Sequence, residues 1–188
     1  MNKNDTREKI IEVTIQKIRN ENIQNFSIRS VVKTLNLTTG SFYKHFKNKN
    51  SLFLEAAQRI SQQIYNQVYP KIMDQEAYPQ KALCVLGSEL IDFFITEPKL
   101  ADFLFFNPEV LDSYSVYSSN QHSFKLLTLT MKLINDLVNK ENLQETSRTL
   151  FIQIWSFIQG YAILIKNQVT TKETSLIEHT LNELIRGK

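Results

Sequence analysis

Apolar residues recur at helical spacing along almost the whole chain, and this periodicity constrains the fold more than any other feature. No segment shows sustained period-two alternation bounded by hairpin turns, so we expect essentially no sheet. Only 4 Gly and 4 Pro occur among 188 residues, which suits long helices and disfavours a turn-rich β fold. The sequence therefore predicts an all-α protein of about nine helices.

Capping residues and prolines divide this pattern into helices. The first is predicted to start at a capping box, Asp5-Thr6-Arg7-Glu8, and to fade at Asn20-Glu21-Asn22. Asn50 or Ser51 is expected to open the fourth helix, and each of the next three starts at or just after a proline. The remaining ranges are about 27–35, 38–46, 50–68, 80–96, 98–105, 108–116, 119–140, 145–167 and 172–186.

The location of the protein is expected to be cytoplasmic. The N-terminus has no apolar segment of a secretory signal, and the single cysteine, Cys84, favours a reduced compartment. A structural role for Cys84 in an apolar helix is favoured over a redox sensor. The uncharged segment 149–165 is at the short limit for a membrane span, but Gln153 and Gln159 favour a helix buried in a soluble interface.

Positive charge is concentrated at the N-terminus. Residues 1–60 hold 11 Lys and Arg against 5 Asp and Glu, whereas residues 61–188 hold 11 against 14. No acidic residue occurs between Glu21 and Glu55. A block of this kind attracts a polyanion such as duplex DNA, with a solvated basic face as the alternative interpretation.

Residues 27–46 predict a helix, a tight turn and a second, shorter helix. Ser27 and Thr38 are good N-caps, and Asn36 tolerates the left-handed conformation that ends a helix. Phe42 and Phe46 stand four residues apart and are expected to anchor the second helix. This is the pattern of a helix-turn-helix, in which the second helix enters the major groove of DNA.

These residues resemble the TetR family of regulators. Residues 26–37 (FSIRSVVKTLNL) resemble the first helix of the family's motif, and residues 38–52 (TTGSFYKHFKNKNSL) match its recognition helix and following turn. The spacing of Tyr43, Phe46, Lys49 and Leu52 is the most diagnostic feature. The likeness is strong over about residues 5–55. Val32 and Asn36 stand where a small Ala and a Gly are commoner, and neither puts the motif in doubt.

The resemblance implies a DNA-binding domain over residues 1–49 and a ligand-binding and dimerisation domain over 50–188. It implies that Tyr43 and Lys49 bind phosphates. Bases or adjacent backbone would be faced by Arg29, Thr39, Gly40 and Lys44, with Thr38, Ser41 and His45 beside them. The expected protein is a homodimeric repressor that a small-molecule inducer releases from a palindromic DNA operator. No cofactor, metal or membrane partner is implied.

Aromatic residues are dense between positions 93 and 161, and together they permit an apolar ligand pocket. A plain core role is the alternative for any one of them. Glu89, Asp92 and Asp102 are candidates for charge complementarity to a cationic ligand, or else belong to a solvated face. The predicted ligand-binding residues are Phe93, Phe94, Phe103, Phe106, Tyr117, Phe124 and Trp155.

The segment Trp155–Gly160 weakly resembles a Trp…His-Gly element of one TetR subgroup, with Gln159 in place of His. A glycine inside a helix costs about 1 kcal/mol relative to Ala, so a close helix approach is expected at Gly160.

Catalysis is disfavoured. The three histidines are far apart in sequence, no Gly-rich phosphate loop occurs, and no nucleophile motif is present. The competing class is a helical ligand-carrier or interaction protein that does not bind DNA specifically.

Overall fold

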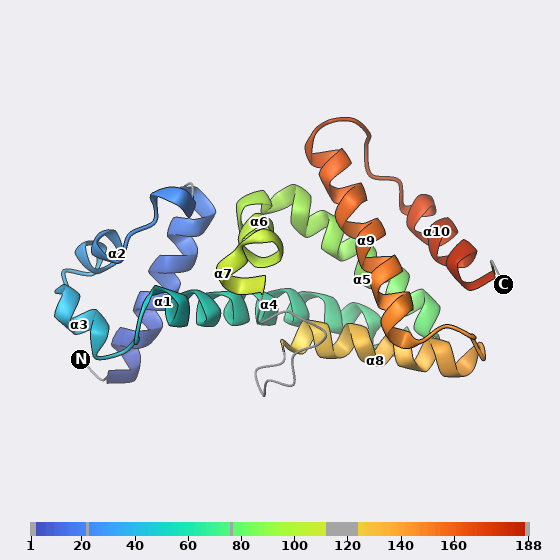
Figure 1. Ribbon diagram of the computed structural model, residues 1–188, viewed down its shortest axis with the longest axis horizontal. Helices are drawn as coiled ribbons and strands as arrows, with labels where there is room; N and C mark the ends of the chain where they lie inside the picture. The colour runs from blue at the N-terminus through green and yellow to red at the C-terminus, as the bar shows by residue number, and fades with distance from the viewer. Residues whose placement is uncertain (1–2, 22, 76, 112–123, 187–188) are drawn as a thin grey trace. The chain divides into compact units, whose positions relative to one another are not determined.

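A computed structural model of the chain describes residues 3–21, 23–75, 77–111 and 124–186. Within these ranges every regular element is helical, which confirms the all-α prediction (Figure 1). The α-helices are α1 (Lys3–Asn20), α2 (Ile28–Thr34), α3 (Thr39–Tyr43), α4 (Lys49–Ile72), α5 (Pro79–Thr96), α6 (Pro98–Phe106), α7 (Pro108–Leu111), α8 (Lys125–Lys140), α9 (Ser147–Lys166) and α10 (Thr174–Arg186). Two 3₁₀ turns, η1 (Ile23–Asn25) and η2 (Met73–Gln75), follow α1 and α4.

The described residues form two compact units. The first lies within 1–61 and 99–122, and the second within 62–98 and 123–188. Helix α4 therefore begins in the first unit and ends in the second, and α6 and α7 belong to the first. These units differ in extent from the functional domains 1–49 and 50–188, which stay a prediction.

The core of the first unit forms around the apolar face of α1. Ile10, Ile11, Thr14, Ile15 and Ile18 are all buried there, as their helical spacing predicts. The helix begins at Lys3, so the predicted start at Asp5 is wrong by two residues. Asp5 lies in the first turn, where its Oδ2 forms an ion pair with Lys9 Nζ at 2.9 Å instead of capping the helix.

Helices α2, α8 and α9 end in the same backbone motif. Asn36, Asn142 and Gln168 have φ values of 54°, 50° and 58°, the left-handed region that favours short polar side chains. After α2, the Asn36 N–H donates to the Lys33 carbonyl and the Leu37 N–H donates to the Val32 carbonyl. This pair of bonds closes the last turn, so Asn36 substitutes for the commoner glycine as predicted.

The fourth helix starts earlier and ends later than its sequence predicts. Asn48 and Ser51 bond reciprocally: the Ser51 N–H donates to Asn48 Oδ1 at 2.8 Å, and the Asn48 N–H donates to Ser51 Oγ at 3.2 Å. Lys49 is therefore the first helical residue rather than Asn50 or Ser51. The helix also continues through Pro70 to the fully buried Ile72, whose burial offsets the backbone hydrogen bond that Pro70 removes.

Helix α5 is central in the second unit and packs against α8, α9 and α10. The connection after α9 is tied down by Tyr161, whose hydroxyl donates to the Thr171 carbonyl at 2.9 Å and accepts the Glu173 N–H at 2.6 Å. Parts of the predicted helices 108–116 and 119–140 lie outside the described residues. By length and composition alone α9 passes the test for a membrane span, as a core helix of a soluble protein also does.

Candidate nucleic-acid interface and ligand pockets

Two hydroxyl caps set the geometry of the α2–turn–α3 segment. Ser27 Oγ accepts the Ser30 N–H at 3.2 Å, and Thr38 Oγ1 accepts the Ser41 N–H at 3.1 Å. Each satisfies a donor that the first turn of a helix leaves without an internal partner. The helix, turn and short second helix predicted for residues 27–46 are present.

Helix α3 is anchored through aromatic rings. Phe42 is fully buried and stacks on Phe46 with ring centroids 5.4 Å apart. The Arg7 guanidinium lies over the Phe46 ring, 5.2 Å from its centroid, and also forms an ion pair with Glu55. Burial raises the pKa of the Glu55 carboxyl, although the charge of Arg7 acts in the opposite direction. Arg7 of α1 thus contacts both Phe46, which follows α3 and stacks on Phe42, and Glu55 of α4.

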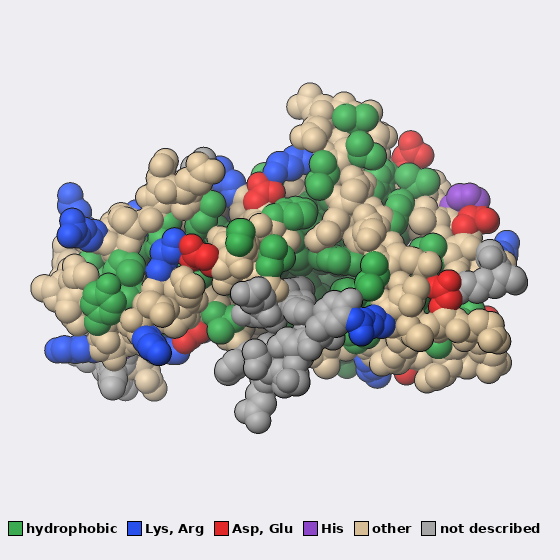
Figure 2. Space-filling model, viewed as in Figure 1, with side chains coloured by type: hydrophobic (Ala, Val, Ile, Leu, Met, Phe, Trp, Pro, Cys, Tyr) green, Lys and Arg blue, Asp and Glu red, His purple; other side chains and the backbone are tan. Residues whose placement is uncertain are grey.

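The predicted DNA-binding side chains lie on the other side of these anchors. Tyr43 is 57% exposed, which disfavours a core role for its ring. The exposed members of the set are Arg29, Thr38, Thr39, Gly40, Tyr43 and Lys44, and the half-buried ones are Ser41, His45 and Lys49. Within the first unit, basic side chains lie on the surface over α2 and α3 (Figure 2). The residues predicted from the sequence thus form a polar surface with basic side chains on and around a short exposed helix.

Lys49 has partners that the sequence did not indicate. Its Nζ pairs with Glu109 Oε1 from α7 at 2.8 Å, and it lies over the Phe53 ring, 4.9 Å from the centroid. Sixty positions separate the two charged residues in the sequence, and no local pattern connects them. A phosphate that binds Lys49 must therefore compete with the Glu109 carboxylate.

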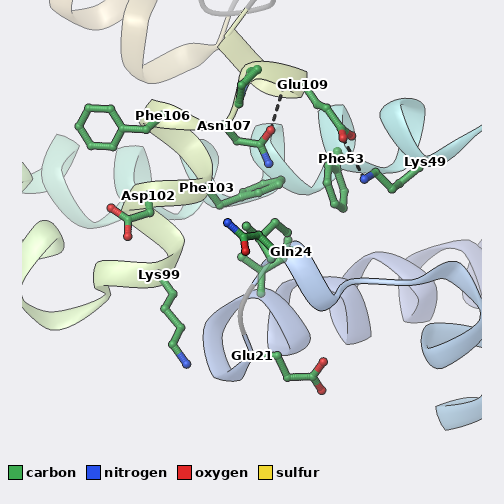
Figure 3. Close-up of a pocket in the computed structure, with 13 residues that line it drawn as sticks. Glu21, Gln24, Lys49, Phe53, Lys99, Asp102, Phe103, Phe106, Asn107 and Glu109 are labelled. Atoms are coloured by element: carbon green, nitrogen blue, oxygen red, sulfur yellow. Dashed lines mark hydrogen bonds and ion pairs between the residues drawn. The ribbon is translucent and has the colours of Figure 1, made fainter.

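A pocket of about 600 Å³ opens beside this ion pair, entirely within the first unit (Figure 3). It lies among the end of α1, η1, the start of α4, α6 and α7. Phe103 and Phe106, two of the predicted ligand residues, belong to its lining. The full lining is Ile18, Glu21, Ile23, Gln24, Lys49, Phe53, Lys99, Asp102, Phe103, Phe106, Asn107, Pro108 and Glu109.

Four of the other predicted ligand residues, Phe93, Phe94, Phe124 and Trp155, lie in the second unit and do not share that pocket. Phe94 and Phe124 are core residues at 2% exposure, and Phe93 is half-buried. Trp155 lines a cavity of about 20 Å³ among α5, α8 and α9, which has room for little more than one water molecule. Tyr117 lies outside the described residues.

The charged side chains considered for a cationic ligand in the second unit already form ion pairs, and its cysteine is partly buried. Glu89 pairs with Lys71 at 2.6 Å, and Asp92 pairs with Lys172 at 2.7 Å. Burial, reinforced by the nearby Glu178 carboxylate, raises the pKa of the Cys84 thiol to about 11. Cys84 is thus a thiol at neutral pH. Within the described ranges, no group of three His, Cys, Asp or Glu side chains is arranged to hold a metal ion.

Apolar side chains stay exposed on α9. Ile152, Ile163 and Leu164 are 41–45% exposed, and Val169 in the following turn is 68% exposed. Gly160 lies on the same helix, and a Cβ added there meets nothing within 4 Å. The close helix approach expected at Gly160 is therefore not made by any of the described residues.

Comparison with known proteins identifies the N-terminal segment. Residues 10–56 match the family model described as bacterial regulatory proteins, tetR family. No curated protein matches the chain.

Solved structures share the fold over nearly their whole length. A TetR family transcription regulator from Marinobacter aquaeolei VT8 is 15% identical, with a TM-score of 0.66 over 98% of this chain and 97% of that one. FadR from Bacillus subtilis, solved in complex with stearoyl-CoA, is 16% identical with a TM-score of 0.65 over 96% and 98%. A Rhodococcus protein of unknown function is 12% identical with a TM-score of 0.72 over 96% and 94%.

Proposed function

Because residues 10–56 match the family model of tetR-type bacterial regulatory proteins, we propose that the chain is a TetR-family repressor released from a palindromic operator by a small molecule. It is a DNA-binding transcription regulator rather than an enzyme. The observation that carries the proposal is the exposed face of α3 and its C-cap, where Thr39, Tyr43 and Lys44 are exposed while Phe42 is buried and anchors the helix. The protein acts in the cytoplasm, where its DNA lies.

The proposal includes a homodimer. One chain carries one recognition helix, whereas two copies related by a twofold axis read two half-sites whose centres lie about 34–36 Å, or a multiple of that, apart. The exposed apolar face of α9 supports this assembly, because the chain itself leaves Ile152 and Ile163 uncovered. A glutamate at Ile163 places a charge on that face, so Ile163→Glu is expected to sediment as a monomer.

Release by a ligand requires that the ligand bind the DNA-bound and DNA-free conformations with different affinities. Helix α4 contributes to both compact units, so it is the natural element to carry a change between them. FadR from Bacillus subtilis, of the same fold, binds stearoyl-CoA, which supports a small organic ligand here. By reciprocity, operator DNA lowers the affinity for that ligand by the same factor.

The test is binding to random duplex DNA across a salt series. Each Lys that contacts a phosphate contributes about one unit to the slope of log K against log salt. Lys49→Ala is expected to lower that slope by about one unit, whereas Lys81→Ala, on exposed α5 surface, leaves it unchanged. A parent protein that neither binds DNA nor shows a salt slope contradicts the proposal and favours the ligand-carrier class.

A further inference from the structure

Glu109 has one satisfied and one unsatisfied carboxylate oxygen. Oε1 holds Lys49, whereas Oε2 is buried and has no hydrogen-bond partner in the part of the chain that the structure describes. Asn107 Oδ1 accepts the Glu109 N–H at 2.9 Å, which fixes the backbone at the start of α7. Figure 3 shows the carboxylate beside Lys49 at the pocket wall. A buried acceptor without a donor lowers the stability of the structure. A ligand that donates a hydrogen bond to Oε2 removes this free-energy cost, which favours its binding.

The charges around the pocket favour a cation. Its lining has the carboxylates Glu21, Asp102 and Glu109 against two ammonium groups, a net charge of −1. Lys99 donates to the Asn20 carbonyl at 2.6 Å, and Lys49 is held by Glu109, so both ammonium groups already have acceptors.

The walls of the pocket favour a flat apolar body. Phe53 and Phe103 meet edge to face with centroids 5.1 Å apart, and both belong to the lining. Ile23 and Pro108 extend the apolar surface. Aromatic and aliphatic walls with a few polar groups among them are the usual form of a small-molecule site.

We propose that this pocket binds a small aromatic cation, an amidine or amine, whose donor groups bond Glu109 and displace Lys49 from it. An amidinium matches a carboxylate in planar, two-bond geometry, so it can engage Oε1 and Oε2 together. The consequence for DNA binding rests on the proposed function: the freed Lys49 becomes available to a DNA phosphate. The site thus strengthens DNA binding, the opposite sign to an inducer that releases the operator.

The size of this effect follows from the ion pair that is exchanged. Lys49 and Glu109 side chains are 37% and 33% exposed, so their pairing is partly screened by water. Pairs of this exposure change an equilibrium by about 1.5- to 5-fold. DNA affinity is therefore expected to rise by that factor when the pocket is filled.

Calorimetric titration of the full chain with benzamidine, a flat aromatic cation, tests the site. The expected dissociation constant is about 1 mM, with the neutral isostere benzamide binding at least tenfold more weakly, about 1.4 kcal/mol by the tenfold rule. Glu109→Gln is expected to remove the difference between the two compounds. Glu12→Gln, which removes an exposed carboxylate of α1 outside the pocket lining, keeps it. Equal affinities for benzamidine and benzamide in the parent protein overturn the proposal.

Binding to random duplex DNA tests the exchange of Lys49. Benzamidine is expected to raise the affinity of the parent about 1.5- to 5-fold, whereas Glu109→Gln has the raised affinity without it and does not respond further. A response that persists in Glu109→Gln overturns the exchange. If benzamidine binds through Glu109 but the parent has no affinity for DNA, the proposed function fails and the pocket stands.

Discussion

Replacing Gly160 with Ala is expected to stabilise the single chain and to weaken its dimer. Gly160 is exposed inside α9, and a Cβ at this position meets nothing within 4 Å. Ala is better than Gly in a helix interior by about 0.8–1.0 kcal/mol, and no contact among the described residues opposes that gain. The free energy of unfolding of the monomer should therefore rise by about that amount.

The dimer should respond in the opposite direction. Ile152, Ser156, Gly160 and Ile163 follow one another at spacings of four, four and three residues, and all are exposed. They form one face of α9 on which the smallest residue leaves room for a helix of the partner. A methyl group inserted into a close-packed contact costs about 1–3 kcal/mol, so the dimer dissociation constant should rise about 5- to 150-fold.

Two measurements separate these effects. Sedimentation across a concentration series gives the dimer dissociation constant of the parent and of Gly160→Ala. Urea unfolding in an Ile163→Glu background, where the chain is expected to be monomeric, isolates the gain in helix propensity. An unchanged dissociation constant alongside a stabilised monomer would refute the reasoning that places Gly160 at the interface.

Three further predictions concern single residues. Thr38→Ala removes the cap of α3 and should lower stability by about 0.5–2 kcal/mol in urea unfolding, whereas Thr38→Ser, which keeps the hydroxyl, should not. Cys84, with a pKa near 11 against an ordinary 9.0, should react with iodoacetamide at pH 7 about 100-fold more slowly than in the urea-unfolded chain; a rate equal to that of the unfolded chain would contradict its burial. Burial raises the folded pKa of Glu55 above 4.5, so its contribution to stability is complete below pH 4.5 and is lost as pH rises through the folded pKa. Glu55→Gln does not titrate, so its unfolding free energy should decline less between pH 4.5 and 7 than that of the parent, and an equal decline would exclude Glu55 as the source.

The sequence predicted the features that depend on local chemistry. The apolar face of α1, the hydroxyl caps Ser27 and Thr38, and the left-handed Asn36 each follow from a residue and its near neighbours. Boundaries were less accurate because tertiary burial decides them. Ile72 is fully buried and keeps α4 helical past Pro70, which the pattern alone predicts as a break.

The sequence predicts only some of the residues that line the pocket. The density of aromatic residues predicts Phe103 and Phe106, yet the side chains that give the pocket its chemistry are Lys49 and Glu109, brought together from distant parts of the chain. Glu109 has no local motif around it, so only the tertiary structure identifies it. The lone signal in the sequence is that a carboxylate follows Pro108 at the start of a helix.

Selection of DNA from a random library by the purified protein tests the central claim most directly. The account predicts enrichment of an inverted repeat with half-site centres about 34–36 Å, or a multiple of that, apart. Thr39→Ala and Lys44→Ala should change the bases selected within each half-site, while Lys49→Ala should weaken binding without changing them. Enrichment of no sequence by the parent protein, or the same bases selected by all three variants with parental affinity, would contradict the assignment of α3 as the helix that reads DNA.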